Sequence, residues 1–370
     1  MQKKCLPTIP SRYGKALFSV MVLFVLFCLL SLSGCAPKSS GSLHFEKAGN
    51  VYTVRGIGTF TGSHVVIPEA YDGLPVTSIA ASAFKDADIE SISLPTTIDT
   101  IGANAFEGSD IEAISLPASL VTIGDSAFLN CKSLNFVESA SAVLSLVGKD
   151  AFLGTPYIEE DSEGDWQDGI LYLNNTVVRA ASSLSGEIRI REGTMTIAYQ
   201  AFRDTPIEKV TFPSGLYHSG KYSFYGCASL KEVVFEGVVG YLGEGLFYDC
   251  AALQAVTLPG ALVNIEDKAF SGCSALTAVT FNQEVQKIGR SAFSRCSSLQ
   301  TVILSDTVLT IGEEAFLDCT ALTAVSGARS LQSIGKQAFF GCTSLTGFAL
   351  PTQNVAIGQL AFDGCPFAEK

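Results

Sequence analysis

The apolar positions of this chain recur with a period close to 23 residues. A phenylalanine marks each period, and its successive spacings are 22, 22, 24, 50 and 22 residues, followed by 23 residues six times. The marker residues are Phe84, Phe106, Phe128, Phe152, Phe202, Phe224, Phe247, Phe270, Phe293, Phe316, Phe339 and Phe362. A fixed period over this length predicts a repeat solenoid, in which each unit stacks on the next. The single gap of 50 residues predicts an insertion in one unit.

Residues 276–299 show one unit most clearly. Apolar and polar residues alternate over 276–281, which predicts a β-strand, and Ile288-Gly289 predicts a second short extended stretch. Phe293 follows in a turn that places its ring in the core, and the glycine at a constant offset, as at Gly289 and Gly312, predicts a tight backbone bend. Because one unit cannot bury its apolar face alone, we expect neighbouring strands to pair at about 4.8 Å. The pattern therefore predicts a β-rich solenoid with short turns.

The segments outside the regular period predict the domain organisation. Extended patterns within residues 43–80 predict an N-terminal β cap, and residues 81–370 predict the solenoid. A pattern similar to that of the cap returns after Phe152, which predicts a β-hairpin insertion at about 153–190. At the other end, the tail 366–370 either covers the last core or leaves the end of the solenoid as a contact surface.

The beginning of the chain has the order of a secretory signal. Four basic residues in the first fifteen positions precede an uncharged apolar run over residues 16–32. Leu32, Ser33, Gly34 and Cys35 then resemble the lipobox of bacterial lipoproteins, in which the cysteine sulfur receives a lipid. That resemblance implies a signal peptide over 1–34, a lipidated tether over 35–42, and an extracytoplasmic protein anchored at the cell surface or outer membrane. An uncleaved membrane anchor is the alternative, because a run of this length can cross a bilayer.

Composition excludes several classes of protein. With 47% hydrophobic and 16% charged residues, the chain is too apolar to be disordered. The net charge is −12, and it becomes −16 without the four basic residues of the signal. An acidic surface repels phosphate backbones, so we expect no nucleic-acid partner and a monomeric body.

Eight of the eleven cysteines lie three residues after a marker phenylalanine. An even count in an exported protein suggests disulfides. One cysteine per unit at a constant offset, however, makes parallel Cβ vectors, whereas a disulfide needs Cβ atoms turned towards each other. The spacing therefore favours a ladder of free thiols packed in the core, without a metal, since no C-x-x-C pair occurs. The clearest members of this core ladder are Phe270, Cys273, Phe293, Cys296, Phe316, Cys319, Phe339 and Cys342.

Candidate chemistry is sparse, which predicts a protein that is not an enzyme and needs no cofactor. The three histidines are scattered, and no nucleophile elbow, zinc motif or phosphate loop occurs. Residues 159–168 place six carboxylates around the only tryptophan, Trp166. They predict a calcium site, a recognition knob or a solvated loop, and the last is favoured because EF-hand spacing is absent. Trp166, Tyr157 and Tyr172 are candidate sugar-stacking residues on the insertion.

The repeated strings I-G-x-x-A-F-x-G-C and L-x-x-V-x-L-P resemble the BspA-like branch of leucine-rich repeat proteins over about residues 43–370. That resemblance implies a secreted or surface protein of a host-associated microbe. Several members of this branch are adhesins. The expected partner is a host extracellular-matrix or cell-surface protein, or another bacterial cell. The alternatives are a glycan-binding accessory lipoprotein and a passive envelope spacer. The exposed strand positions carry small residues, which favours weak, multivalent contact.

Overall fold

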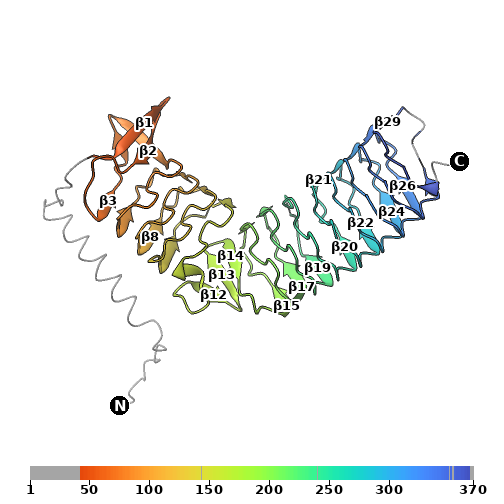
Figure 1. Cartoon of the computed structure of the whole chain (residues 1–370), viewed down its shortest axis with the longest axis horizontal. Helices are drawn as coiled ribbons and strands as arrows, with labels where there is room; N and C mark the ends of the chain where they lie inside the picture. Colours follow the sequence, from red (N-terminus) through yellow and green to blue (C-terminus); the bar gives the residue numbers. More distant parts are fainter. Residues whose placement is uncertain (1–41, 143, 240, 350, 352–353, 367–370) are drawn as a thin grey trace, which may run out of the picture.

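The computed structural model describes residues 42–366 except 143, 240, 350 and 352–353. The predicted signal peptide and the lipobox residues Leu32 to Cys35 lie outside the described residues. Within the described part, the predicted β-solenoid is confirmed: each regular unit supplies a longer strand, a short strand and a turn (Figure 1).

The longer strands form two parallel sheets. The first has the order β10-β8-β6-β3 and the second the order β15-β17-β19-β20-β22-β24-β26-β28. Their bounds are β3 His64–Val66, β6 Ser91–Ser93, β8 Ala113–Leu116, β10 Phe136–Ser139, β15 Gly186–Arg189, β17 Ile207–Phe212, β19 Glu232–Phe235, β20 Ala255–Thr257, β22 Ala278–Thr280, β24 Thr301–Leu304, β26 Ala324–Gly327 and β28 Gly347–Phe348. Alternate residues point inward, so that in β22 Val279 is buried between exposed Ala278 and Thr280.

The short strands form a second set of parallel ladders. In the first half β5 (Leu74–Ile79) pairs with β7, and the ladder continues through β9 to β11. The other bounds are β7 Thr100–Ile101, β9 Thr122–Ile123, β11 Leu146–Val147, β14 Thr176–Ala180, β16 Thr196–Ile197, β18 His218–Ser219, β21 Asn264–Ile265, β23 Lys287–Ile288, β25 Thr310–Ile311, β27 Ser333–Ile334 and β29 Ala356–Ile357.

The turns form a third hydrogen-bond ladder. In one unit the N–H groups of Ser291, Phe293 and Arg295 donate to carbonyls of the next unit at 2.8, 2.7 and 2.7 Å. Ser291 and Arg295 have φ values of 51° and 61°, in the left-handed region. Because left-handed residues alternate with others in the turn, every second N–H points along the axis of the solenoid. Consecutive turns therefore form hydrogen bonds with each other as strands do.

The marker phenylalanines stack inside the solenoid. Phe293 packs between Phe270 and Phe316, with ring centroids 5.2 Å away on each side. The glycine beside each short strand has a different role from the predicted bend. Gly312 has no positive φ, but a Cβ there would lie 2.7 Å from the carbonyl carbon of Gly289. Glycine is required because neighbouring units approach each other closely at this position.

All eight repeat cysteines are free and buried. Each thiol donates to the carbonyl of the marker phenylalanine one unit earlier, as from Cys296 to Phe270 at 3.2 Å and from Cys319 to Phe293 at 3.1 Å. In three of the four units without cysteine a hydroxyl takes the same position, at Ser109, Thr155 and Thr205, and the unit of Phe84 has Ala87 there. Thr155 and Thr205 donate to the phenylalanine carbonyl of their own unit, at 2.7 and 2.8 Å. The position therefore holds a small side chain, which in most units donates a hydrogen bond within the core.

The predicted cap at 43–80 contains five strands. β1 (His44–Ala48) pairs antiparallel with β2 (Val51–Gly56), and β2 then pairs parallel with β5. β4 (Ala70–Tyr71) is a short antiparallel partner of β5. The ladder of short strands thus begins on a hairpin, which covers the end of the first core.

The segment after Phe152 repeats this arrangement. A 3-10 turn, η1 (Pro156–Ile158), precedes β12 (Asp165–Gln167), which pairs antiparallel with β13 (Ile170–Leu173). β13 pairs antiparallel with β14, and β14 pairs parallel with β16. The predicted hairpin insertion is therefore a second cap that opens a second array. We call residues 43–158 the first array and 165–366 the second array.

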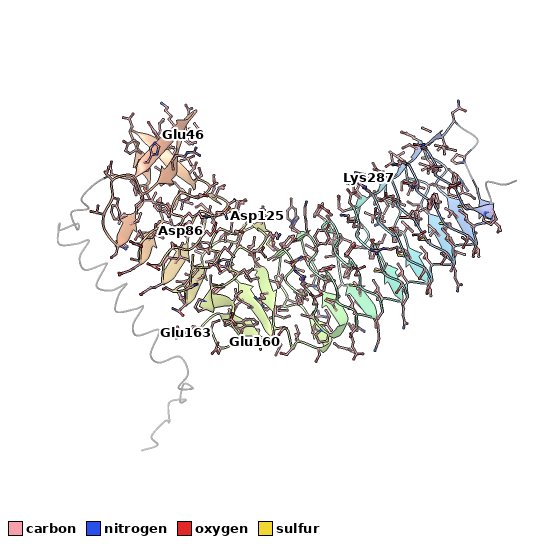
Figure 2. The ribbon with its side chains drawn as sticks, in the orientation of Figure 1. Glu46, Asp86, Asp125, Glu160, Glu163 and Lys287 are labelled. Atoms are coloured by element: carbon pink, nitrogen blue, oxygen red, sulfur yellow. The ribbon has the colours of Figure 1, made fainter. Side chains whose placement is uncertain are left out.

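The two arrays meet at an angle. Figure 1 shows two arms that join beside β12, β13 and β14, with the longer strands along the outer edge of the bend. None of the sheets formed by the described residues runs from one array into the other. The acidic residues Glu160 and Glu163 lie on this outer edge at the junction (Figure 2).

Candidate binding site at the junction of the two arrays

Side chains hold the two arrays together along the edge of the short strands. Asn174 Nδ2 donates to the carbonyl of Ser141 at 2.6 Å, and Asn175 Nδ2 donates to that of Ala142 at 2.9 Å. Thr196 Oγ1 donates to the carbonyl of Leu144 at 3.1 Å. These bonds replace the backbone ladder that joins units elsewhere.

The turn ladder is interrupted at the same place. The turn of the last unit in the first array receives bonds from the preceding unit, for example from Phe128 N–H to the Ala151 carbonyl at 2.7 Å. Its own forward donors, the N–H groups of Asp150 and Phe152, have no acceptor among the described residues. On the other side, the Tyr199 and Arg203 carbonyls receive no donor from that same part of the chain. The arrays thus touch at the short strands and separate at the turns.

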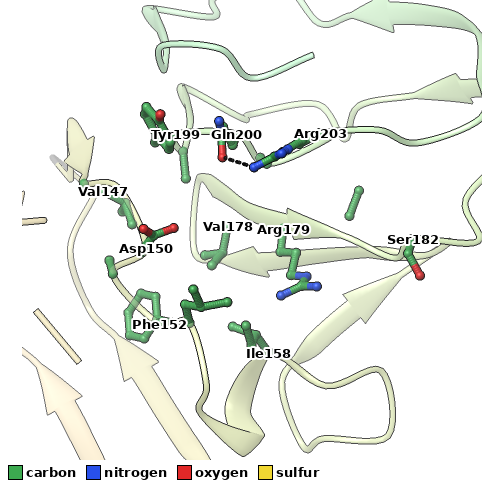
Figure 3. Close-up of a pocket in the computed structure, with 16 residues that line it drawn as sticks. Val147, Asp150, Phe152, Ile158, Val178, Arg179, Ser182, Tyr199, Gln200 and Arg203 are labelled. Atoms are coloured by element: carbon green, nitrogen blue, oxygen red, sulfur yellow. Dashed lines mark hydrogen bonds between the residues drawn. The ribbon is translucent and has the colours of Figure 1, made fainter. Parts of the chain in front are cut away.

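A pocket of about 310 Å³ lies where the turns of the two arrays separate. Figure 3 shows Asp150 and Phe152 on one side, Tyr199 and Arg203 on another, and Arg179 of β14 between them. Its apolar wall comes from Ile158, Val178 and the half-exposed Leu153. This volume lies within the range of about 300–1,000 Å³ typical of ligand pockets.

Arg179 differs from the other arginines around it. It is half-buried and lines the pocket, and its guanidinium forms no ion pair or hydrogen bond within the described chain. Arg203, on the far wall, is bonded to Asp204 at 3.0 Å and to the Gln200 side chain at 3.3 Å. The pocket therefore holds one cationic group that no carboxylate of the described residues neutralises.

A row of tyrosines extends from the pocket over the turns of the second array. The rings of Tyr199 and Tyr222 lie 6.2 Å apart, and Tyr222 contacts Tyr248 at 6.1 Å. Tyr225 lies 5.4 Å from Tyr248. We call these four residues, with the two arginines stacked on them, the tyrosine strip.

The arginines of the tyrosine strip are Arg203 and Arg295. Arg203 lies over the Tyr225 ring at 5.2 Å, and Arg295 lies 6.0 Å from the Tyr248 ring while donating to its hydroxyl at 3.1 Å. Burial raises the pKa of Tyr222, and its hydrogen bond to Glu244 at 2.8 Å raises it further. All four rings are half-buried, so they are fixed in place and still present a face to solvent.

The sequence profile described as the BspA type leucine rich repeat region matches in six copies, over residues 63–161, 165–277 and 240–369. The chain belongs to this family. One boundary between matched stretches falls at residues 161–165, where the structure places the start of the second array. The boundary of the repeats in sequence and the junction in the structure therefore agree.

Solved structures of leucine-rich repeat proteins are similar to this BspA type chain. A leucine-rich repeat protein from Bacteroides ovatus is 23% identical, with 90% of this chain and 93% of that one covered and a TM-score of 0.38. The pneumococcal vaccine antigen PcpA is 16% identical, with coverages of 87% and 99% and a TM-score of 0.38. A leucine rich cell surface protein from Faecalibacterium prausnitzii is 17% identical, with coverages of 86% and 96% and a TM-score of 0.31. No curated protein matches the sequence of this chain.

The structure corrects the sugar-stacking hypothesis for this BspA type protein. The side chains of Tyr157 and Tyr172 are only 1% and 2% exposed, so neither ring has a free face for a sugar. Trp166 is half-buried against the core and donates from Nε1 to Ser162 Oγ at 3.0 Å. The indole of Trp166 is therefore held by the insertion itself.

The acidic segment 159–168 gives no sign of an ion site. Asp165 pairs with Arg191 at 2.8 Å, and no group of three or more His, Cys, Asp or Glu in the described residues is arranged to hold a metal. His64 bonds to Ser91 at 2.7 Å and His218 stacks on Tyr241 at 4.8 Å, so these two rings are used structurally. Among the described residues, no helix is long and apolar enough to cross a membrane.

Sequence reasoning missed the tyrosine strip, although a signal was present. Six of the eleven tyrosines fall between residues 199 and 248. The exposed positions of the longer strands, where a binding face is expected, carry small residues instead, as at Ala255 and Thr257. The strip lies on the turns, next to the marker phenylalanines.

Proposed function

We propose that this BspA type protein is a surface lipoprotein that binds macromolecules of host or neighbouring cells through the tyrosine strip. The observation that carries the proposal is the contiguous set of four tyrosines and two arginines on the turns of the second array. Tyrosine and arginine are enriched among the residues that supply most of the binding energy at protein interfaces. Their rings are already held by each other, so little side-chain entropy is lost on binding.

The proposed attachment uses the lipid on Cys35. Support comes from the four residues Leu32 to Cys35 directly behind the apolar run. An anchored array of many copies adds avidity to each weak contact. Labelled fatty acid should enter the wild-type protein in cells and not Cys35→Ala, and retention of label by the variant would refute the anchor.

Adherence of cells that display the full chain tests the binding surface. The double variant Tyr225→Ser/Tyr248→Ser should reduce adherence to immobilised matrix proteins and to partner cells by at least about tenfold. Tyr217→Ser is the matched control, because Tyr217 is 64% exposed and lies outside the strip. Equal adherence of wild type and double variant, at equal surface display, would refute this function.

A glycan partner is the second candidate, because exposed faces of the strip tyrosines can also stack on sugars. An array of immobilised oligosaccharides and matrix proteins, probed with the same variants, separates the two. A passive spacer predicts no ligand that depends on the strip.

A further inference from the structure

One wall of the junction pocket carries the hydrogen-bonding groups of a missing turn. In a regular unit, the N–H groups at the positions of Asp150 and Phe152 donate to the next unit at 2.7–3.2 Å. Here the N–H groups of Asp150 and Phe152, two residues that line the pocket, have no acceptor in the described chain. On the opposite wall the Ala201 carbonyl accepts the N–H of Ala180, at the end of β14, at 2.7 Å. An extended segment beside the first array would therefore accept the two N–H groups through its carbonyls.

Arg179 adds a charge requirement to this pattern. Each of the other described arginines forms an ion pair with Asp or Glu, and even the most exposed, Arg329, lies 3.5 Å from Asp306. Arg179 is the exception, although the chain has 36 acidic residues and only 24 Lys and Arg. A half-buried guanidinium without a counter-charge is the group that a ligand carboxylate would satisfy, because arginine binds carboxylates with two parallel hydrogen bonds.

The rest of the pocket limits what can enter. Its volume of about 310 Å³ suits two or three residues of a chain rather than a folded surface. Leu153, 46% exposed, and Ile158 offer apolar contact for a neighbouring side chain. Asp150, whose carboxylate forms an ion pair with Lys149 at 3.9 Å, repels a second negative charge on its side. The ligand therefore carries its carboxylate on the Arg179 side.

We propose that the pocket binds an extended peptide segment of a partner protein, whose acidic side chain or terminal carboxylate pairs with Arg179 while its backbone carbonyls accept the N–H groups of Asp150 and Phe152. This inference goes beyond the proposed function, because it assigns a second site with its own class of ligand. A peptide is favoured over an acidic sugar because the N–H groups of Asp150 and Phe152, two residues apart, match the carbonyl spacing of an extended peptide, as in strand addition to an open sheet edge.

The probe is an array of blocked hexapeptides of mixed composition with one central Glu, together with the same array carrying Gln instead. It is incubated with the full chain in detergent, beside an array of oligosaccharides that contain sialic or uronic acid. Wild type should bind Glu peptides at least about tenfold more tightly than their Gln counterparts, because a charge-assisted bond is lost in the latter.

Variants locate the site. Arg179→Gln should remove the preference for Glu, whereas Arg329→Gln, an arginine 87% exposed elsewhere, should keep it. Ser182→Tyr should block the pocket from its rim, and Ser183→Tyr should not, since Ser182 lines the pocket and both serines are exposed. Asp150→Asn should strengthen binding of acidic peptides by removing a repulsion. Unchanged thermal unfolding of these variants shows that they are folded.

Three outcomes would overturn the inference: no difference between Glu and Gln peptides, an unchanged preference in Arg179→Gln, or binding by acidic oligosaccharides alone. Loss of adherence in the Tyr225→Ser/Tyr248→Ser variant together with no peptide binding would refute this inference and leave the proposed function standing. Peptide binding that requires Arg179, with adherence unaffected by the Tyr225→Ser/Tyr248→Ser variant, would refute the proposed function and leave this inference standing.

Discussion

The thiol of Cys296 donates to the backbone carbonyl of Phe270, one unit earlier, at 3.2 Å. The same carbonyl already accepts the N–H of Cys273 at 3.2 Å. The thiol thus occupies its second lone pair, and both partners are buried. A side chain chosen for its small volume therefore also links neighbouring units, and the stacked phenylalanines bring each carbonyl within its reach.

Substitution of Cys296 should separate the contribution of its volume from that of its hydrogen bond. Cys296→Ala removes the bond and leaves a small cavity, so the free energy of unfolding should fall by about 1–2 kcal/mol. Cys296→Ser keeps a donor, and hydroxyls already stand at this position in Ser109 and Thr205. Urea denaturation should place the serine variant between alanine and wild type, and an alanine variant as stable as wild type would contradict the bond.

Alkaline pH should weaken the fold through the same thiols. Burial raises the pKa of Cys273 and Cys296 above the ordinary value of 9.0, so the folded protein keeps them protonated when the unfolded chain ionises. Their contribution is fully present below pH 9.0 and is lost as pH rises above it. When the pH is raised from 8 to 10, the midpoint of urea denaturation of the wild type should decrease. The decrease should be smaller for Cys296→Ser. An equal fall in both proteins would assign the effect to other groups.

Neighbouring units approach each other so closely at the glycine beside each short strand that a side chain there should not fit. Gly312→Ala would place a Cβ 2.7 Å from the Gly289 carbonyl carbon, so we expect a loss of about 1–3 kcal/mol from overpacking. Gly260→Ala is the control, because no atom lies within 4 Å of its Cβ position and its φ is not positive. Thermal unfolding of the two variants should differ clearly, and equal stability would show that neighbouring units can move apart.

The regular part of this fold could be predicted from sequence because its determinants are local and repeated. Residues equivalent to Phe293 and Cys296 recur at fixed offsets. Because similar units stack on each other, each of these residues has the same buried surroundings in every unit. The reason for glycine could not be predicted, since the approach of Gly289 to Gly312 comes from the next unit and not from the dihedral angles of either residue.

The candidate site could not be predicted because it depends on where the period fails. The segment 170–190 has the apolar pattern of a hairpin, but only the pairing of β14 with β16 makes it a second cap. That pairing leaves Phe152 at the end of one array, where its N–H has no acceptor in the described chain. Arg179 and Tyr199 then share a pocket although nothing in their spacing differs from that of surface residues.

The angle between the arrays should depend on the few hydroxyl and amide bonds at the junction. Thr196 Oγ1 is buried and donates to the Leu144 carbonyl at 3.1 Å, whereas one backbone bond, from Tyr199 N–H to Val147, reaches across at 3.5 Å. Thr196→Val keeps the volume but leaves the Leu144 carbonyl with only the longer bond from the Thr176 hydroxyl, at 3.5 Å. This loss should cost about 1 kcal/mol and speed hydrogen exchange at the Tyr199 amide. Thr277→Val, which loses an exposed bond of 3.1 Å inside the second array, is the control. Small-angle scattering should show a broader distribution of shapes only for the first variant, and identical profiles would mean that apolar packing alone fixes the bend.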